Sequence, residues 1–289
     1  MNKKHIALTC TAALSLSLLA GCGSNGTNAE TTPDPKAPTS VETLNIAFSP
    51  YADSDTILAA TEPLESLLKE KLLEKGYDVE NINMTVGTSY TAVGEALSAG
   101  SADIGFISGG NYVLFSDDCD VLVTALRYGI NKDSEDAANW NDGTLEQFTD
   151  ETSTYYRSII LAGPSAKGQE LLSKVNDGEE LTWEDLNSAT WAVMGPTSAS
   201  GYIYPSLWLQ SNYGKTISDL DNVVQSDSYT TSMARLASGQ VDVAVGFAHL
   251  RAKYADQWQS DFGGTDEMVN QTGVIGVTEG IYNDMIAYS

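Results

Sequence analysis

The feature that most constrains the fold of this chain is a repeated alternation of short β-prone runs with amphipathic helices. A β-prone run at 44–48 precedes a helical pattern at 55–75, and further runs at 83–86 and 102–107 enclose a helix expected at 90–99. The same order returns after residue 156, with strands expected at 158–162, 190–194 and up to 246, separated by helices expected at 168–175 and 205–213. Strands that alternate with helices build mostly parallel sheets covered by helices. The sequence therefore predicts an α/β protein.

An internal correspondence links the two halves. Ser89-Tyr90-Thr91 is followed at fixed offsets by Leu97, Gly100 and Asp103, and Ser228-Tyr229-Thr230 is followed at the same offsets by Leu236, Gly239 and Asp242. In each copy the serine suits a helix cap, the leucine a core face, the glycine a helix end and the aspartate a strand start. Either the halves are related, or two similar units have converged on one pattern. In both cases we expect two helix N-termini, ends that suit anions, on facing parts of the protein.

The N-terminus carries an export signal. Lys3 and Lys4 precede a short apolar run at 6–20, which ends in Leu-Ala-Gly followed by Cys22. This pattern resembles the bacterial lipobox, which implies cleavage after residue 21 and a lipid on Cys22. The alternative is an ordinary secretory signal with an incidental cysteine. Residues 1–21 are thus expected to be a signal peptide and 22–41, which are mostly small and polar, a flexible tether outside the bacterial membrane.

Charge and cysteine usage limit the partners. The formal net charge is −24, and it becomes −26 when the signal removes Lys3 and Lys4. So acidic a surface argues against nucleic acid as a partner. Only Cys119 would remain as a free thiol beside a lipidated Cys22, so no intramolecular disulfide is expected. We expect a monomer without a cofactor or metal, attached to the membrane by its lipid alone.

A loop of small hydroxyl residues is the second candidate site. Ser198-Ala199-Ser200-Gly201 leaves the strand that is expected to end at residue 194 and enters the helix expected near Pro205. Hydroxyls and backbone N–H groups at such a loop can bind an oxyanion, although a serine cap is also an ordinary way to start a helix. Several tyrosines at expected strand or helix ends would face the same cleft: Tyr90, Tyr156, Tyr229 and, more weakly, Tyr51.

Other polar residues favour binding over catalysis. Arg127 and Arg157 flank the expected crossover between the halves, where they either pair with an anion or tie the lobes together. His249 is the only histidine left after the signal, and no Gly-x-Ser-x-Gly elbow accompanies it, so hydrolase chemistry is not expected. The acidic stretch 131–152 is expected to be a surface insertion or lobe-boundary loop, and its acidic residues do not form a calcium-loop pattern.

Four segments in order carry a family resemblance: 102–112, which includes Ser108, then 155–160, 198–205 and 237–244. Together they resemble the phosphate-, phosphite- and phosphonate-binding proteins of ABC transporters. The resemblance implies a two-lobed type II periplasmic-binding fold with a ligand cleft between the lobes. The expected lobes are 42–130 with 271–289, and 131–270.

The resemblance also implies roles for residues. Hydroxyls of Ser198 and Ser200 and the backbone N–H of Gly201 would bind phosphoryl oxygens, while Ala199 stands where the family has a threonine. The full set of candidate ligand contacts is Ser198, Ala199, Ser200, Gly201, Tyr156, Tyr229, Tyr90, Ser108, Tyr51 and His249. Binders of aminoethylphosphonate have a carboxylate near the position of His249, and its absence there predicts that this ligand is not favoured.

The resulting functional prediction is an extracytoplasmic lipoprotein that holds a small phosphorus oxyanion (phosphonate, phosphite or phosphate) for an ABC permease. The alternatives are another small organic or sulfonate ligand, or a sensor that has kept the fold. The stretch 282–288 is expected to begin a helix, and relatives continue beyond it, so the sequence is expected to be incomplete.

Overall fold

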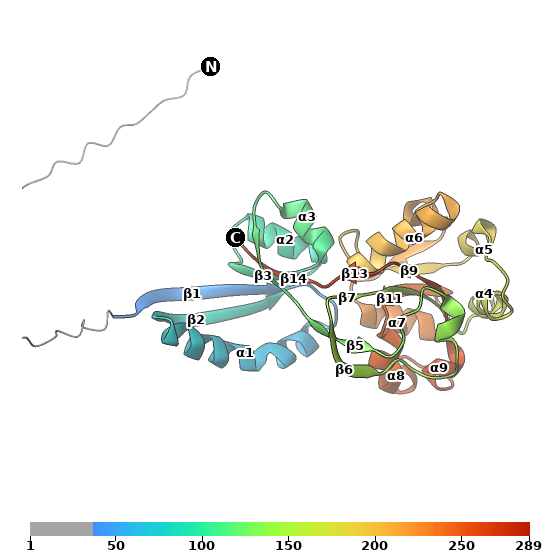
Figure 1. The fold of residues 1–289 in the computed structure, drawn as a ribbon, viewed down its shortest axis with the longest axis horizontal. Coiled ribbons are helices and arrows are strands. Elements are labelled where there is room, and N and C mark those ends of the chain that lie inside the picture. The colour runs from blue at the N-terminus through green and yellow to red at the C-terminus, as the bar shows by residue number, and fades with distance from the viewer. Residues whose placement is uncertain (1–36) are drawn as a thin grey trace, which may run out of the picture. The chain divides into compact units, whose positions relative to one another are not determined.

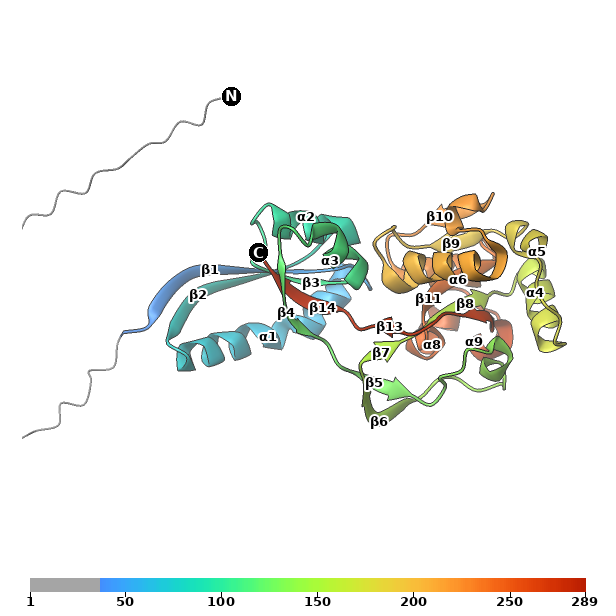
Figure 2. The same cartoon turned by 45° about the horizontal axis from the view of Figure 1, so that its top comes forward.

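The computed structural model describes residues 37–289, which form two α/β lobes (Figures 1 and 2). The predicted signal peptide, Cys22 and most of the predicted tether lie outside the described residues. Within the described range, no helix combines the length and apolar character needed to cross a bilayer.

The first lobe is built on a five-stranded sheet with the order β2-β1-β3-β14-β4, in which β14 is antiparallel to both its neighbours. Its elements are β1 (Thr39–Phe48), α1 (Ser54–Glu74), β2 (Tyr77–Val86), α2 (Tyr90–Ser98), β3 (Ile104–Ile107), α3 (Gly109–Phe115), β4 (Asp120–Thr124) and β14 (Met285–Tyr288). Because side chains alternate along a strand, Ile46 and Phe48 pack with Ile57 of α1, whereas Ala47 packs with Val93 of α2 on the other face. Helices therefore cover both faces of the sheet, as Figure 1 shows.

The second lobe repeats this plan with the sheet order β10-β9-β11-β8-β12. Its elements are β8 (Ser158–Ala162), α4 (Ala166–Asn176), α5 (Trp183–Asn187), β9 (Trp191–Val193), a π-helical turn η2 (Ala199–Ile203), α6 (Tyr204–Tyr213), η3 (Ile217–Asp219), β10 (Val223–Gln225), α7 (Tyr229–Ala237), β11 (Val243–Phe247), α8 (Leu250–Ser260), α9 (Met268–Gln271) and β12 (Gly273–Val277). Trp191 packs with Leu171 and Leu209 on one face, and Ala192 packs with Met233 on the other. This sheet is also covered on both faces.

The internal correspondence is present in the structure. Ser89 and Ser228 cap α2 and α7, and each side-chain oxygen accepts a hydrogen bond, at 3.1 Å, from the backbone N–H three residues later. Gly100 and Gly239 follow the two helices with φ of 66° and 70°, a left-handed conformation that glycine adopts without strain. Tyr90 and Tyr229 thus begin equivalent helices in the two lobes.

The ends of the chain depart from expectation. Residues 282–288 do not begin a helix: β13 (Ile281–Tyr282) pairs with β7 (Tyr155–Tyr156), and β14 inserts between β3 and β4. The expected return to the first lobe at residue 271 is too early, because β12 pairs with β8 in the second sheet. The tether was expected to reach residue 41, but pairing with β2 extends β1 back to Thr39.

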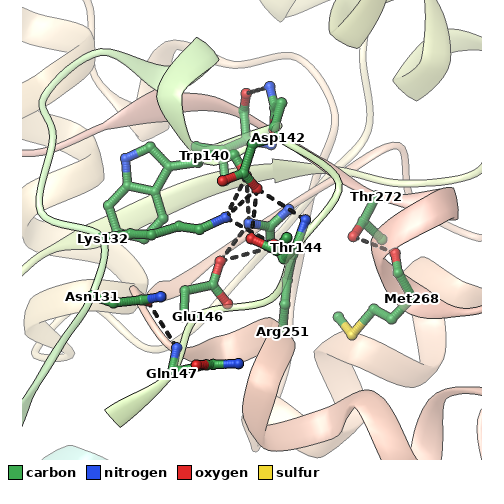
Figure 3. Close-up of polar contacts among 12 residues, drawn as sticks. Asn131, Lys132, Trp140, Asp142, Thr144, Glu146, Gln147, Arg251, Met268 and Thr272 are labelled. Carbon is green, nitrogen blue, oxygen red and sulfur yellow. Dashed lines mark hydrogen bonds and ion pairs between the residues drawn. The ribbon is translucent and has the colours of Figure 1, made fainter. Parts of the chain in front are cut away.

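The acidic stretch 131–152, expected to be a surface insertion or lobe-boundary loop, is anchored to the second lobe. It contains η1 (Ala137–Trp140), and β6 (Phe148–Ser153) pairs with β5 (Arg127–Ile130). Trp140 is fully buried, and Arg251 of α8 forms a buried ion pair with Glu146 while its Nη2 donates to the Trp140 carbonyl at 2.8 Å (Figure 3). Lys132 donates to the Asp142 carboxylate at 2.6 Å beside this pair. These contacts fix the segment to the second lobe, and no group of three or more acidic, histidine or cysteine side chains within the described range is placed to hold a metal.

We predict that Arg251→Met destabilises the protein by about 3–5 kcal/mol, because it leaves the Glu146 carboxylate buried without its cation. Urea unfolding measures the change. Lys69→Met is the matched control: it breaks the exposed pair with Glu65 and should cost at most about 1 kcal/mol. The double variant Arg251→Met with Glu146→Leu should recover part of the loss. Equal destabilisation by Arg251→Met and Lys69→Met would contradict the assignment of a buried, stabilising ion pair.

Candidate ligand-binding site

A cavity of about 390 Å³ lies between the two lobes. Its walls come from both lobes and from the crossover segments: Tyr51, Tyr90, Ser108, Ala125, Leu126, Arg127, Tyr128, Phe148, Tyr156, Ser198, Ala199, Ser200, Tyr229, Phe247, His249, Lys253 and Asp284. Most of the predicted site residues lie just after the carboxyl ends of β1, β2, β3, β9, β10 and β11. In open α/β sheets ligands bind outside these ends of the strands.

Nine of the ten predicted contacts line this cavity, and Gly201 does not. Its N–H donates to Ser198 Oγ at 3.2 Å as part of the local turn. A side chain at this position would collide with Met194, which explains the glycine. The Gly201 donor therefore stays a prediction, and Ala199 presents a methyl group where the resemblance leads us to expect a hydroxyl.

Hydroxyl groups gather at one end of the cavity. Tyr229 Oη lies 3.2 Å from Ser198 Oγ and 2.9 Å from Ser200 Oγ. Burial raises the pKa of Tyr229 to about 12, and burial likewise raises the pKa of Tyr90 and Tyr156 well above the ordinary tyrosine value. All three phenols are therefore protonated at neutral pH. The cluster can donate several hydrogen bonds to an oxyanion.

Charged groups without protein partners also face the cavity. The Arg127 guanidinium lies 3.8 Å over the Tyr156 ring, yet no residue in the described range hydrogen-bonds or forms an ion pair with it, and its Nε is buried. Lys253 reaches the same cavity from α8, with its ammonium 5.2 Å from the Tyr51 ring centroid. Burial lowers the pKa of Lys253.

Asp284 brings a carboxylate into the cavity from the crossover before β14. Within residues 37–289 no hydrogen bond or salt bridge satisfies its side chain, and burial raises its pKa while nearby Arg127 lowers it. The prediction that a carboxylate is missing rested on position 249 alone. That prediction concerned this position only, and tertiary folding supplies a carboxyl group to the cavity from a distant part of the chain.

His249 is a neutral member of the wall. Burial, together with the positive charges of Arg127 and Lys253, lowers its pKa to about 4. Its ring lies 4.6 Å from that of Phe247 and 5.0 Å from that of Phe148, measured between centroids. At neutral pH it therefore offers an aromatic surface and no charge.

The lobes meet at the edge of the cavity. Ser108 at the start of α3 donates to the Thr197 carbonyl at 2.6 Å, and Thr91 Oγ1 lies 3.4 Å from Thr197 Oγ1. At the crossovers, Asn283 donates to the carbonyls of Ala125 and Ser153 at 3.0 and 2.8 Å. These contacts connect the segments that would move if the lobes opened.

The two crossover arginines have different surroundings. Arg157 pairs with Asp133 and Glu135 and donates to the Thr278 carbonyl at 2.9 Å, so acidic residues of the protein neutralise its charge. It does not line this cavity. Arg127 is the arginine that faces the cavity. Sequence reasoning left both roles open for both residues, because only tertiary contacts distinguish them.

Several residues that line the cavity were not predicted from the sequence. Phe148, Lys253 and Asp284 follow no parallel strand and belong to no motif. Lys253 lies on α8, four residues after His249, which caps that helix; this spacing places side chains on one face and was the one available signal. Nothing local in the sequence indicated Phe148 or Asp284.

The sequence matches the model of a known protein family. Residues 46–289 match the family model described as the periplasmic phosphonate substrate-binding protein of ABC transporters. No curated protein matches the sequence.

Solved structures share the fold at low identity. A binding-protein component of an ABC phosphonate transporter from Pseudomonas aeruginosa superposes with a TM-score of 0.58 at 15% identity, covering 86% of this chain and 68% of that one. PhnD1 from Prochlorococcus marinus, in complex with methylphosphonate, gives 0.56 at 11% identity, with coverages of 86% and 76%. XAC2383 from Xanthomonas citri, bound to ATP, gives 0.54 at 12% identity, with coverages of 86% and 77%.

We predict that His249 does not titrate between pH 8 and 5 in the ligand-free protein. Residues 22–289 contain no other histidine, so in a protein of these residues a single imidazole resonance in proton NMR follows it. Arg127→Gln should raise the pKa of His249 because it removes a neighbouring positive charge, whereas Lys71→Gln on α1 should not. A wild-type pKa near 6.5 would contradict the burial of this ring.

Proposed function

The chain belongs to the family of periplasmic phosphonate-binding proteins of ABC transporters, and on this basis we propose that its inter-lobe cavity binds a phosphonate. The family is a component of transport and not a class of enzyme. Its members bind small ligands outside the cytoplasm and interact with a membrane permease.

The observation that carries this proposal is the unpaired Arg127 guanidinium beside the hydroxyl cluster. Among the described residues no ion pair neutralises this partly buried cation, although the Asp284 carboxyl lies near it, and an anionic ligand would compensate for the cost of its burial. Arg127 and Lys253 are both cationic, against one carboxylate at Asp284, so the cavity is suited to an anion despite the strongly acidic protein. Charge-assisted hydrogen bonds from Arg127 to a phosphoryl oxygen would hold the ligand in a fixed orientation.

Hydroxyl donors complete the anion site. Ser198, Ser200 and Tyr229 already contact one another, so only small rotations of their hydroxyls would turn them toward phosphoryl oxygens. Tyr90 reaches the cavity from the first lobe. A ligand bound by donors of both lobes would favour the closed arrangement, which a permease can distinguish from the open one.

Asp284 limits which anions fit. Its unpartnered carboxylate would repel a fully deprotonated ligand but would accept a hydrogen bond from a P–OH group or from an amine on the ligand. Sulfate and sulfonates carry no such proton near neutral pH, so the cavity favours the phosphorus oxyanions. A ligand with an amino group, which the sequence alone disfavoured, has a partner here.

We also propose that the protein is tethered to the outer face of the cell membrane through lipid on Cys22. The support is the Leu-Ala-Gly-Cys sequence after a short apolar run, which an export peptidase would cleave. A single mature chain with this tether would deliver ligand directly to its permease. A sensor with the same fold would lack the permease interaction.

Isothermal titration tests the ligand. Mature protein with Cys22→Ser should bind methylphosphonate with micromolar or tighter affinity and sulfate much more weakly. Arg127→Gln should weaken methylphosphonate binding by about 1.5–3 kcal/mol, the contribution of a hydrogen bond to a charged group. Lys71→Gln removes the same charge far from the cavity and should have little effect. Equal loss in both variants would show that only the overall charge matters.

Metabolic labelling with a radioactive fatty acid tests the tether. The full-length chain should become labelled and Cys22→Ser should not, because the thioether needs the cysteine sulfur. Cys119→Ser is the matched control, since that thiol is buried within the first lobe and should leave labelling intact. Label that persists in Cys22→Ser would remove the lipid anchor from the proposal.

A further inference from the structure

We propose that the favoured ligand is a phosphonate with a large apolar organic group, and that Phe148 is the residue that selects for this group. The inference rests on the proposed function, because it assumes that the phosphoryl end of the ligand occupies the hydroxyl cluster. It then assigns the other end of the same cavity.

A continuous row of aromatic rings runs from the hydroxyl cluster to Phe148. Tyr229, which contacts Ser198 and Ser200, meets Phe247 edge-on with 5.0 Å between ring centroids. Phe247 lies 4.6 Å from His249, and His249 lies 5.0 Å from Phe148. An anion held at the first ring would direct its substituent along the other three. Apolar or aromatic groups gain most from such a wall.

The far end of this row exposes apolar side chains to the cavity and to solvent. Leu126, Tyr128 and Phe148 are 63%, 62% and 59% exposed, and all three line the cavity. Exposed apolar residues grouped around a cavity are typical of a ligand-binding surface, whereas scattered ones need no explanation. Phosphite or phosphate would leave all three side chains in water.

The residues just before Phe148 are anchored by two sets of contacts. Two residues before it, Glu146 forms the buried ion pair with Arg251, which lies two residues after His249 (Figure 3). The adjoining Asn131 and Gln147 exchange hydrogen bonds of 2.9 Å, which join the two sides of the segment. The ion pair therefore ties the residues that carry Phe148 to those that carry His249. A wall that is already ordered loses little entropy when a ligand binds.

The size of the cavity agrees with this assignment. Its volume of about 390 Å³ lies in the range of sites that hold drug-sized ligands, roughly 300–1,000 Å³. A phosphonate group with a single methyl has five heavy atoms and would leave most of this space to water. A ring or a branched chain would fill the part beside the aromatic row.

Titration calorimetry with methylphosphonate and phenylphosphonate tests the inference on the mature chain with Cys22→Ser. Wild type should bind phenylphosphonate at least about tenfold more tightly, equivalent to about 1.4 kcal/mol. Phe148→Ala should remove most of this preference, weakening phenylphosphonate about tenfold and methylphosphonate by less than about threefold. Tyr77→Ala, which removes a partly exposed ring from β2 away from the cavity, should keep the full preference.

Each remaining outcome has a distinct meaning. Equal affinity of wild type for both phosphonates would overturn the inference and leave the proposed function standing. The same conclusion follows if Phe148→Ala keeps the wild-type preference. Failure of wild type to bind either phosphonate, while circular dichroism shows it folded, would overturn the proposed function itself.

Discussion

The position of the ligand cavity depends on the direction of the parallel strands in the two sheets. In both lobes the carboxyl ends of the inner strands point to one edge of the sheet, so the residues that follow them meet at the cavity. Ser108, the Ser198–Ser200 loop and His249 reach the site in this way, from β3, β9 and β11. Tyr90 and Tyr229 add the first residues of the equivalent helices α2 and α7. The site thus follows from the topology of two similar sheets.

The cavity contains two cationic side chains, although the protein as a whole is strongly acidic. Within the described residues Arg127 and Lys253 reach the cavity without forming an ion pair, although the Asp284 carboxyl lies near Arg127. Arg157 nearby is neutralised by Asp133 and Glu135. A folded protein tolerates unpaired cations only where something else compensates for the cost of removing them from water. A bound anion would do so, which connects the local electrostatics with a family that carries phosphonates.

The segment between the lobes adds features that the repeated plan does not provide. Arg127 and Phe148 lie on the paired strands β5 and β6, and Asp284 lies on the returning crossover. The buried Arg251–Glu146 pair holds the β5–β6 segment against α8. Specificity is therefore expected to reside on connections, where sequence can change without disturbing either sheet.

The sequence by itself determined the α/β class, the order of most elements, the caps at Ser89 and Ser228, and nine of the ten proposed contacts that line the cavity. Those features depend on local periodicity and on residues next to strand ends, which can be read from neighbours in the chain. Tertiary structure decided the rest. Insertion of β14 between two distant strands overrode the helical pattern expected at 282–288, and long-range folding brought Asp284, Lys253 and Phe148 to the cavity. The contacts of β14 and of Asp284 and Phe148 join residues more than a hundred positions apart, so no local pattern encodes them, and only Lys253 had a local signal in its spacing from His249.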